Sequence, residues 1–386
     1  MAADRRKILL AVGTRPEALK LAPVVQALHA CHEPFEVRVC ATGQHREMLD
    51  QALKFMSIVP DYDLKIMSPN QRPSDVAARV LYGMDEIFTA YEPDLVLVQG
   101  DTTTALAAAL AAYYRRIPSA HVEAGLRTGN NYAPWPEEGN RRLLASLARF
   151  HFAPTEAARG NLLSEGIAKE DIYVTGNTIV DALADITGRF KRDDAIYNDK
   201  AQEFSYLHSA RRLILVTSHR RENIGAPMER ICRALKAIVI EHTDIELLFP
   251  VHLNPNVRGT IHDILGSLHG PVAERVHLTE PVDYFSFVYL MMQAHIIITD
   301  SGGIQEESPS LGVPTLVLRE STERPEAVEA GCTLLVGTDE EKIVHEANRL
   351  LGDVTHHEAM GRAVNPYGDG TAGQRIADIL AVGDWP

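Results

Sequence analysis

The sequence contains little cysteine and too little positive charge to balance its acids. Its 386 residues include four cysteines that form no CxxC pair: Cys31, Cys40, Cys232 and Cys332. They are too few for a disulfide framework and give no zinc motif, so we predict a reducing compartment. Lysine and arginine number 38 against 52 aspartates and glutamates, which gives a formal net charge of −14. Because such a chain does not attract nucleic acid or anionic membranes overall, any phosphate ligand must be met by a local cluster of positive groups.

Long hydrophobic runs are also absent. The first apolar run, Ile8–Val12, ends at Gly13 and is too short for a signal-peptide core or a membrane span. No other stretch is long enough to cross a bilayer, so we predict a cytoplasmic protein with no membrane partner. Hydrophobic residues make up 45% and charged residues 23%, the balance of an ordinary globular protein.

What the sequence does contain is a regular alternation of strand and helix patterns. Short apolar, β-branched runs have the composition of parallel strands buried on both faces. These runs are Ile8–Val12, Val37–Cys40, Leu95–Val98, Ala120–Val122, Tyr173–Val174, Leu213–Val216, Leu247–Val251, Val276–Leu278, Ile296–Ile298, Thr315–Leu318 and Leu334–Val336. Between them lie helix patterns such as Pro16–His29, Ser74–Tyr91, Thr104–Arg115, Pro227–His242 and Glu340–Leu351. The alternation predicts an α/β fold.

The chain is too long for one hydrophobic core, so two domains are expected. A charged stretch with little apolar pattern, from about Gly188 to Arg212, divides the chain into two similar strand–helix series. We therefore predict doubly wound domains at 1–187 and 213–365, joined by a connecting segment at 188–212. The turn and helix at 366–386 are expected to pack back on the N-terminal domain. Ligands of such folds bind at the carboxyl ends of the strands, here in the crevice between the domains.

The turn after the first strand could bind an anion. Gly13 permits a tight turn, and Pro16 suits the first helical position, where its missing N–H costs nothing. Arg15 would then lie beside a helix N-terminus, which attracts groups such as phosphate. A well-capped helix with a surface arginine explains this motif equally well.

A second turn, in the C-terminal domain, could also hold phosphate. Ser301, Gly302 and Gly303 follow a strand and open a helix, so their N–H groups could form a cradle. Glu307 lies about one turn later and could accept hydrogen bonds from a ribose. A glycine-rich turn needed only for packing is the alternative. The segment Gly368–Gly373 matches GxGxxG but follows no strand, so it predicts a turn and helix start and supports no nicotinamide cofactor.

Carboxylates follow two other strands of the N-terminal domain. Asp101 comes after the strand Leu95–Val98, and Glu123 comes after Ala120–Val122, so both can reach the same edge of the sheet. Converging carboxylates push at least one pKa upward, which would provide an acid and a base near neutral pH. Asp101 could instead cap a helix, and Glu137 could complement a helix dipole from the first turn.

Histidines follow two strands of the C-terminal domain. His219 and Arg220 come after Leu213–Val216, and together they are a candidate for ligand binding or catalysis, although a lone histidine is usually structural. His252, after the next strand, is a weaker candidate. The segment His356–Glu358 is interpreted as solvated surface, and no spacing of residues argues for a metal site.

Taken together, these motifs resemble the non-hydrolysing UDP-N-acetylglucosamine 2-epimerases, which have a GT-B type fold. The resemblance covers nearly the whole chain, in order. The segments that carry it are Gly13–Glu17, Gln99–Thr104, His121–Arg127, Trp135–Glu138, His219–Asn223, Asp300–Glu307, Glu323–Glu326 and Asn365–Gly370. It implies two Rossmann-like domains with the active site in the cleft between them, no cofactor, and a homodimer.

The resemblance also implies a reaction. The family interconverts UDP-N-acetylglucosamine (UDP-GlcNAc) and UDP-N-acetylmannosamine (UDP-ManNAc), which supply cell-surface polysaccharide. The C2 proton is removed, UDP is eliminated anti to give 2-acetamidoglucal, and UDP re-adds after reprotonation on the opposite face. This chemistry requires a base, an acid on the other face and positive groups for the departing diphosphate, all of which the motifs offer.

Matching the family's motifs position by position implies a role for each site residue. The catalytic residues implied are Asp101, Glu123, Glu137 and His219. Proton transfer at C2 falls to Asp101 and Glu123, and which of them is the base is left open. The substrate-binding residues implied are Arg15, Lys20, Phe287, Ser301, Gly302, Gly303, Glu307 and Arg324. Of these, Glu307 would hold the ribose and Phe287 would pack near the uracil, while the diphosphate would meet Arg15, His219 and the cradle at 301–303.

Many bacterial members of the family also bind a second UDP-GlcNAc as an allosteric activator. The matching positions are Gln44, Glu47, Arg72, Arg220 and His252. Glu47 replaces a glutamine of those regulated members.

Other classes of function share parts of this pattern. A GT-B glycosyltransferase would have the same fold and UDP cradle but would require an acceptor. A sensor would bind UDP-GlcNAc and leave it unchanged. A hydrolysing relative would release free ManNAc, and an epimerase of a UDP-sugar acid would need an extra cation facing the sugar's C6.

Overall fold

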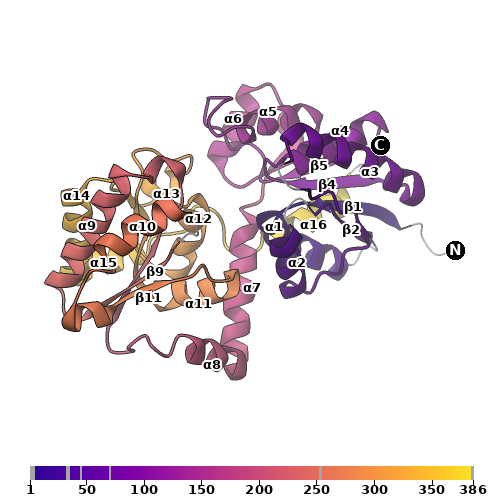
Figure 1. The fold of residues 1–386 in the computed structure, drawn as a ribbon. Helices are drawn as coiled ribbons and strands as arrows, with labels where there is room; N and C mark the ends of the chain where they lie inside the picture. The colour runs from indigo at the N-terminus through magenta and orange to yellow at the C-terminus, as the bar shows by residue number, and fades with distance from the viewer. Residues whose placement is uncertain (1–4, 32–34, 44–45, 69–70, 252–253, 384–386) are drawn as a thin grey trace. The chain divides into compact units, whose positions relative to one another are not determined.

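The computed structural model describes residues 5–31, 35–43, 46–68, 71–251 and 254–383. The chain divides into two compact units. Unit 1 consists of Met1–Ala182 with Tyr367–Pro386, and unit 2 consists of Leu183–Pro366. Each unit is built on one parallel sheet that alternates with helices (Figure 1). The predicted α/β class, with two Rossmann-like halves, is confirmed.

The sheet of unit 1 has the strand order β3-β2-β1-β4-β5-β6-β7. Its strands are β1 (Arg6–Val12), β2 (Phe35–Ala41), β3 (Tyr62–Asp63), β4 (Leu95–Gln99), β5 (Ser119–Val122), β6 (Phe150–Ala153) and β7 (Ile172–Val174). The central strands are apolar along nearly their whole length because helices cover both of their faces. All neighbouring strands run parallel, so their carboxyl ends share one edge.

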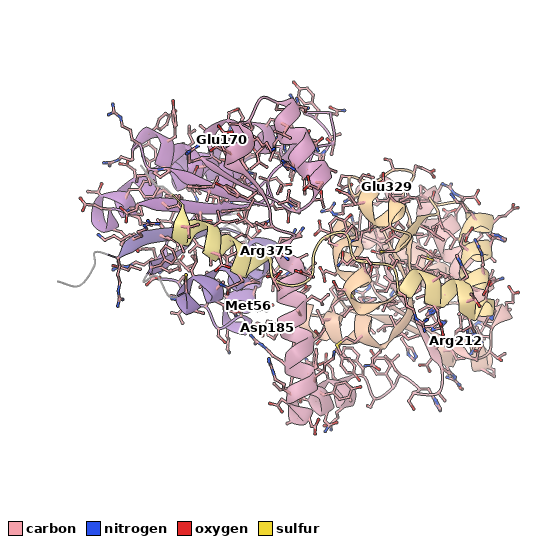
Figure 2. The ribbon with its side chains drawn as sticks, turned by 180° about the vertical axis from the view of Figure 1, so that it is seen from behind. Met56, Glu170, Asp185, Arg212, Glu329 and Arg375 are labelled. Carbon is pink, nitrogen blue, oxygen red and sulfur yellow. The ribbon has the colours of Figure 1, made fainter. Side chains whose placement is uncertain are left out.

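The helices of unit 1 include residues from both ends of the chain. They are α1 (Arg15–Ala30), α2 (Arg46–Phe55), α3 (Pro73–Tyr91), α4 (Thr103–Tyr114), α5 (Glu137–Leu147), α6 (Glu156–Ser164) and α16 (Ala372–Val382). The C-terminal helix α16, yellow in Figure 1, packs against α1. Gly373 permits this close approach, since a Cβ there would lie 2.8 Å from the carbonyl oxygen of Pro23. Arg375 of α16 (Figure 2) donates to the carbonyl oxygen of Thr175 at 3.1 Å.

Unit 2 has a six-stranded sheet in the order β10-β9-β8-β11-β12-β13. Its strands are β8 (Arg212–Thr217), β9 (Ile245–Pro250), β10 (Val276–Thr279), β11 (Ala294–Thr299), β12 (Thr315–Val317) and β13 (Thr333–Leu335). Its helices include α8 (Asp194–Glu203), α9 (Ala226–Glu241), α10 (Pro255–Ile264), α11 (Tyr284–Gln293), α12 (Gly302–Leu311), α13 (Pro325–Glu329), α14 (Glu340–Gly352) and α15 (Val354–Gly361). Arg212 (Figure 2) ties the start of β8 to the end of α14 through the carbonyl oxygen of Leu351, at 2.7 Å. The strand order reverses between β8 and β11, where ligands of such sheets bind.

The structure adds to the sequence interpretation and corrects it at His357. Strands β3 and β6 were not expected. Residues 188–212 contain the end of α7 (Thr178–Arg192), which begins in unit 1, and the whole of α8. His357 is not solvated surface, because its ring stacks on His295 with centroids 3.9 Å apart. The GxGxxG match is a turn before α16, as predicted. None of the helices in the described ranges is long and apolar enough to cross a membrane.

A buried carboxyl lies in the first turn of α1. Glu17 is 1% exposed, and its carboxylate accepts hydrogen bonds from the Gly13 N–H at 3.1 Å, the Thr14 hydroxyl at 2.8 Å and the Thr102 hydroxyl at 2.7 Å. Burial raises the pKa of Glu17 to about 7, although hydrogen bonds from Thr102 and Thr14 oppose the shift.

The close contact of α16 with α1 predicts that a methyl group added at Gly373 destabilises the protein, whereas one added at an exposed helical glycine of the same unit does not. We expect Gly373→Ala to lower the free energy of unfolding by about 1–3 kcal/mol, because the backbone of Pro23 must move. In the same unit, Gly160 of α6 is exposed, and a Cβ there meets no atom within 4 Å. Gly160→Ala should therefore be neutral or stabilise by up to about 1 kcal/mol. Urea unfolding of both variants tests this, and equal effects would contradict the packing argument.

The buried carboxyl predicts a pH-dependent stability. Between pH 4.5 and about 7 the folded protein keeps the Glu17 proton that the unfolded chain has already released. This contribution is therefore fully present below pH 4.5 and is lost as the pH rises through 7, for a total of about 3 kcal/mol. Unfolding free energies of the wild type and of Glu17→Gln, measured from pH 4 to pH 8, should diverge by that amount. Parallel curves would show that Glu17 does not titrate in this range.

Candidate active site

The predicted carboxylates of unit 1 follow neighbouring strands at one edge of its sheet. Gln99 and Val122, the last residues of β4 and β5, are paired in the sheet. Asp101 and Glu123, which follow them, therefore lie at the same edge of the sheet. The turn between Gln99 and Asp101 is fixed by Gly100, whose N–H donates to the carbonyl oxygen of Val122 at 3.0 Å. Its own carbonyl oxygen lies 2.7 Å from Nε2 of His121. Burial lowers the pKa of His121 to about 3, so the ring is neutral and Nε2 donates.

Glu123 has an unusual backbone conformation. Its φ of +65° lies in the left-handed region, which costs a residue with a side chain about 1–2 kcal/mol. Gly125 follows at a φ of +91°, where a Cβ would lie 2.3 Å from the carbonyl oxygen of Ala158. The tight turn holds the Glu123 side chain against Lys20 of α1, with which it forms a largely buried ion pair. Strain of this kind is typical of functional positions.

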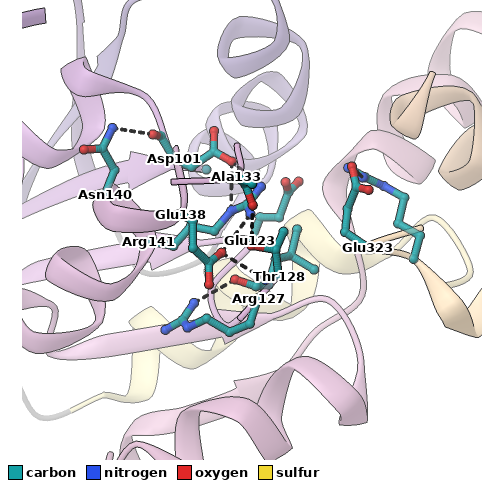
Figure 3. A network of polar contacts seen from close by, with 12 residues as sticks. Asp101, Glu123, Arg127, Thr128, Ala133, Glu138, Asn140, Arg141 and Glu323 are labelled. Atoms are coloured by element: carbon teal, nitrogen blue, oxygen red, sulfur yellow. Dashed lines mark hydrogen bonds and ion pairs between the residues drawn. The ribbon is translucent and has the colours of Figure 1, made fainter. Parts of the chain in front are cut away.

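Asp101 is held by the first turns of α5. The guanidinium of Arg141 donates to one oxygen of the Asp101 carboxylate from Nε at 2.9 Å and lies 2.6 Å from it at Nη2. Asn140 donates to the Asp101 carbonyl oxygen at 2.7 Å (Figure 3). Glu138, which is fully buried, accepts a bond from Arg141 at 3.2 Å. Burial alone would lower the pKa of Arg141, but the charges of Asp101 and Glu138 outweigh it and raise that pKa.

Glu138 also fixes the loop that precedes α5. Its carboxylate accepts hydrogen bonds from the N–H groups of Thr128 and Gly129, at 3.1 and 3.2 Å. The same side chain therefore positions both the loop and Arg141 (Figure 3). Glu137, the neighbouring predicted catalytic residue, is partly exposed, and its side chain makes no hydrogen bond or ion pair with the described part of the chain.

Arg15 is the first residue of α1 and is partly exposed. Its guanidinium makes no hydrogen bond or ion pair with any described residue. This distinguishes it from Lys20, which is paired with Glu123, and from Arg127, which donates to Glu165 at 2.8 and 2.7 Å. An uncompensated arginine beside a helix N-terminus is suited to an anionic ligand.

In unit 2, the ends of β8 and β11 are joined by one buried carboxylate. Asp300 is fully buried and accepts a hydrogen bond from the Ser218 hydroxyl at 2.7 Å. It also accepts bonds from the N–H groups of His219 and Arg220, each at 3.0 Å, and from the side chain of Asn223 at 2.9 Å. Four donors compensate the buried charge and fix the backbone of the His219 turn. The His219 ring itself is half-exposed, with Nδ1 3.4 Å from the carboxylate of Asp300.

The glycine-rich turn after β11 begins α12. Its first residue, Gly302, is covered by Arg324, since a Cβ on Gly302 would lie 2.4 Å from Nη1 of that arginine. Arg324 is held by Glu306 and Glu323, with both bonds at 2.7 Å. Burial raises the pKa of Glu323, but the charges of Arg324 and Arg319 outweigh it and lower that pKa to about 2.

A Cβ on the next residue, Gly303, would meet nothing closer than 3.6 Å. Ser301 is partly exposed at the cap of α12, and its N–H donates to the hydroxyl of Thr299 at 2.9 Å.

Glu307 is buried one turn into α12. It accepts a hydrogen bond from the Tyr284 hydroxyl at 2.9 Å. Phe287, the residue predicted to pack near the uracil, lies one turn after Tyr284 on α11 and is partly exposed. The same helix therefore carries both Phe287 and the tyrosine that binds Glu307.

Sequence reasoning assigned no role to Asp300, Glu17 or Arg141. The pattern Thr14-x-x-Glu17 has the spacing of a capping box and was the one available signal for Glu17, although the Thr14 side chain caps no N–H of α1.

The residues predicted to bind an activator are only partly described. Gln44 and His252 lie outside the described residues, as does the side chain of Glu47. Arg72 is exposed at the cap of α3 and donates to Asp75 at 3.1 Å. Arg220 donates to the carbonyl oxygen of Asp300 at 3.0 Å. In the described ranges, no group of three or more potential ligands could hold a metal ion.

Comparison with known proteins identifies the family. Residues 27–381 match the family model described as UDP-N-acetylglucosamine 2-epimerase. The chain is 53% identical over 375 residues to the UDP-N-acetylglucosamine 2-epimerase of Escherichia coli K12, covering 97% of this chain and 98% of the relative.

Two solved structures are similar over nearly the whole chain. The UDP-GlcNAc 2-epimerase of Neisseria meningitidis, bound to UDP-GlcNAc, is 46% identical with a TM-score of 0.89, covering 97% of this chain and 99% of that one. The Methanocaldococcus jannaschii enzyme, in complex with UDP-GlcNAc and UDP, is 34% identical with a TM-score of 0.79, covering 98% and 100%. The fold is thus of the GT-B type that the motifs implied. The chain belongs to the UDP-N-acetylglucosamine 2-epimerase family.

Proposed function

We propose that the protein catalyses the reversible epimerisation of UDP-GlcNAc to UDP-ManNAc at C2, without hydrolysis. The observation that carries the proposal is the pair of carboxylates, Asp101 and Glu123, at the ends of neighbouring strands, each held by its own cation. The family and the similarity to enzymes named for this reaction support the choice of substrate.

The proposed chemistry is an elimination followed by a re-addition. One carboxylate takes the proton from C2, the electrons of that C–H bond form a C1=C2 double bond, and the C1–O bond breaks with its electrons on UDP. The intermediates are 2-acetamidoglucal and UDP. A proton is then delivered to the opposite face of C2 while a UDP oxygen re-forms the bond to C1. Atoms and electrons balance without an oxidant or reductant.

Asp101 and Glu123 are assigned to the two proton transfers, and either can be the base. Lys20 and Arg141 restrict the positions of these carboxylates, which supports proton transfer because a catalytic carboxylate must lie within hydrogen-bond reach of the proton it moves. Glu137 and His219 join them in the proposed site through the family's motifs.

The leaving diphosphate requires positive groups that do not already have a partner. Arg15, which has none among the described residues, and the N-terminus of α12, with Ser301, Gly302 and Gly303, meet this need. Glu307 would accept hydrogen bonds from the ribose, since a carboxylate has lone pairs for donors besides Tyr284. Phe287 would pack near the uracil, with Lys20 and Arg324 completing the pocket.

The charges of unit 1 argue against a sugar acid as the substrate. Lys20 is paired with Glu123, Arg141 with Asp101, and Arg127 with Glu165. These cations are compensated, so none of them is left to meet a carboxylate at C6 of the sugar. Arg15, which is uncompensated among the described residues, is assigned to the diphosphate and not to the sugar, so the proposal takes an uncharged N-acetylhexosamine as the substrate.

The proposal extends to the compartment in which the reaction takes place. All four cysteines are free thiols, which supports a reducing, cytoplasmic compartment. Supply of cell-surface polysaccharide precursors, activation by a second UDP-GlcNAc and assembly as a homodimer stay predictions.

The reaction predicts exchange of the C2 proton. Proton NMR of UDP-GlcNAc with the protein in deuterated water should show UDP-ManNAc with deuterium at C2 of both sugars. Asp101→Asn and Glu123→Gln should each lower kcat by about 10²–10⁴-fold and retain UDP binding, because each removes a proton-transfer group. The control Glu156→Gln alters an exposed carboxylate of the same unit and should retain activity. Free ManNAc with UDP would instead indicate hydrolysis, and an unchanged spectrum would indicate a transferase or sensor.

The proposed phosphate cradle at 301–303 predicts that Gly303→Ala weakens UDP binding without destabilising the protein. The fold accommodates a Cβ at Gly303, so Gly303→Ala should unfold like the wild type. If the diphosphate approaches this backbone, the methyl group should raise the Kd for UDP about tenfold or more, or ~1.4 kcal/mol. Gly259→Ala, in α10 of the same unit, is the control, since a Cβ there meets no atom within 4 Å. Calorimetry with UDP decides, and an unchanged Kd for Gly303→Ala would exclude this cradle.

A further inference from the structure

The buried carboxyl of Glu17 connects two turns that are far apart in the sequence. One carboxylate oxygen accepts bonds from the Gly13 N–H and the Thr14 hydroxyl, in the turn after β1. The other accepts a bond at 2.7 Å from the hydroxyl of Thr102, in the turn after β4. Because β1 and β4 are neighbours in the sheet, Glu17 bridges two adjacent strand ends.

Each of these turns carries one residue of the proposed site. Arg15 directly follows Thr14, and Asp101 directly precedes Thr102. The Thr102 hydroxyl also accepts a bond from the Ala105 N–H at 3.0 Å, which starts α4. A displacement of Thr102 therefore moves the beginning of α4 and the backbone that carries Asp101.

Helix capping alone does not account for Glu17. In a capping box, the glutamate three residues after the N-cap threonine reaches back to a backbone N–H at the helix N-terminus. The bonds from Gly13 and Thr14 are local contacts of this kind, although the Thr14 side chain caps no N–H of α1. Capping does not explain the bond to Thr102, which lies 85 residues away. Burial of the carboxylate is unfavourable in itself, and the raised pKa of Glu17 reflects that cost.

The turns are packed too closely for a substitute contact. A Cβ on Gly13 would lie 2.3 Å from the Thr104 hydroxyl and 2.9 Å from the Thr42 hydroxyl.

The charged groups near Glu17 in the sequence or the sheet are Arg15 and Lys20 of α1, Asp101 after β4 and Glu123 after β5. Lys20, Asp101 and Glu123 are held in ion pairs with one another or with Arg141.

We infer that Glu17 is a positioning residue that fixes the spacing between the turn of Arg15 and the turn of Asp101. This inference rests on the proposed function, in which Arg15 meets the diphosphate and Asp101 moves a proton at C2 of the same substrate. A misplacement of about 1 Å between reacting groups costs on the order of 100-fold in rate. Loss of the bridge should thus lower kcat more than it weakens binding.

The test compares two pairs of variants. Glu17→Gln keeps the length of the side chain but cannot present two acceptor oxygens, so at pH 8, where the wild-type carboxyl is ionised, we expect kcat to fall about 10- to 100-fold with KM within about threefold of the wild type. Thr102→Val removes the hydroxyl and should have a similar effect, whereas Thr102→Ser, which keeps the hydroxyl, should restore at least half of the activity. The double variant should be no slower than the slower single variant, because both remove one bridge.

The matched control is Thr155→Val. Thr155 caps α6 in the same unit by accepting a bond from the Ala158 N–H at 3.1 Å, as Thr102 does for α4, but it makes no bond to Glu17. The variant Thr155→Val should be destabilised to a similar extent as Thr102→Val but should keep the wild-type kcat. If Glu17→Gln does not fold, the comparison of Thr102→Val, Thr102→Ser and Thr155→Val decides alone.

The outcomes separate this inference from the proposed function. Wild-type protein that does not exchange the C2 proton of UDP-GlcNAc would overturn the proposed function. Exchange by the wild type with an unchanged kcat in Glu17→Gln or Thr102→Val would overturn the role of Glu17. An equal loss of kcat in Thr155→Val would do the same, since it would reduce the effect to general loss of stability.

Discussion

The charged side chains at the carboxyl ends of the two sheets are mostly buried, and the structure depends on how each charge is compensated. A buried carboxylate without partners is strongly unfavourable, so Asp300 collects four donors and Glu123 lies against Lys20. Breaking such a pair costs more than the pair contributes, because the remaining charge stays buried. Compensation therefore sets the positions of the functional groups as well as their charge.

Compensation of charge also distinguishes arginines that are bound to acids of the protein from an arginine that is available to a ligand. Arg141 and Arg127 are bound to acids of unit 1, and Arg324 is bound to acids of unit 2. Arg15 has no such partner among the described residues. Residue type alone does not distinguish these arginines, whereas their partners do. The left-handed conformation of Glu123 is a second feature of a kind that is common at functional sites, since its strain must be offset by the packing around it.

Much of the fold could be predicted from the sequence because buried parallel strands are apolar throughout. Strand β6 was missed because His151 interrupts its apolar run, yet that ring is buried and its pKa is lowered by burial to about 4. Asp101 and Glu123 could be placed because a residue just after a strand must lie at the edge of the sheet. Their partners could not, since Arg141 and Lys20 come from helices 40 and 103 residues away. Pairing at such separations is set by the packing of whole elements and leaves no local pattern.

The composition of unit 1 from two separate stretches of chain has a consequence for synthesis. Unit 2 lies between these stretches in the sequence, so all of it leaves the ribosome before α16 does. Until residues 372–382 have emerged, the surface of α1 that α16 covers has no partner, and Asp181 lacks the N–H of Gly373. Domains generally fold as units during translation. The part of the protein that is made first is therefore the part that is completed last.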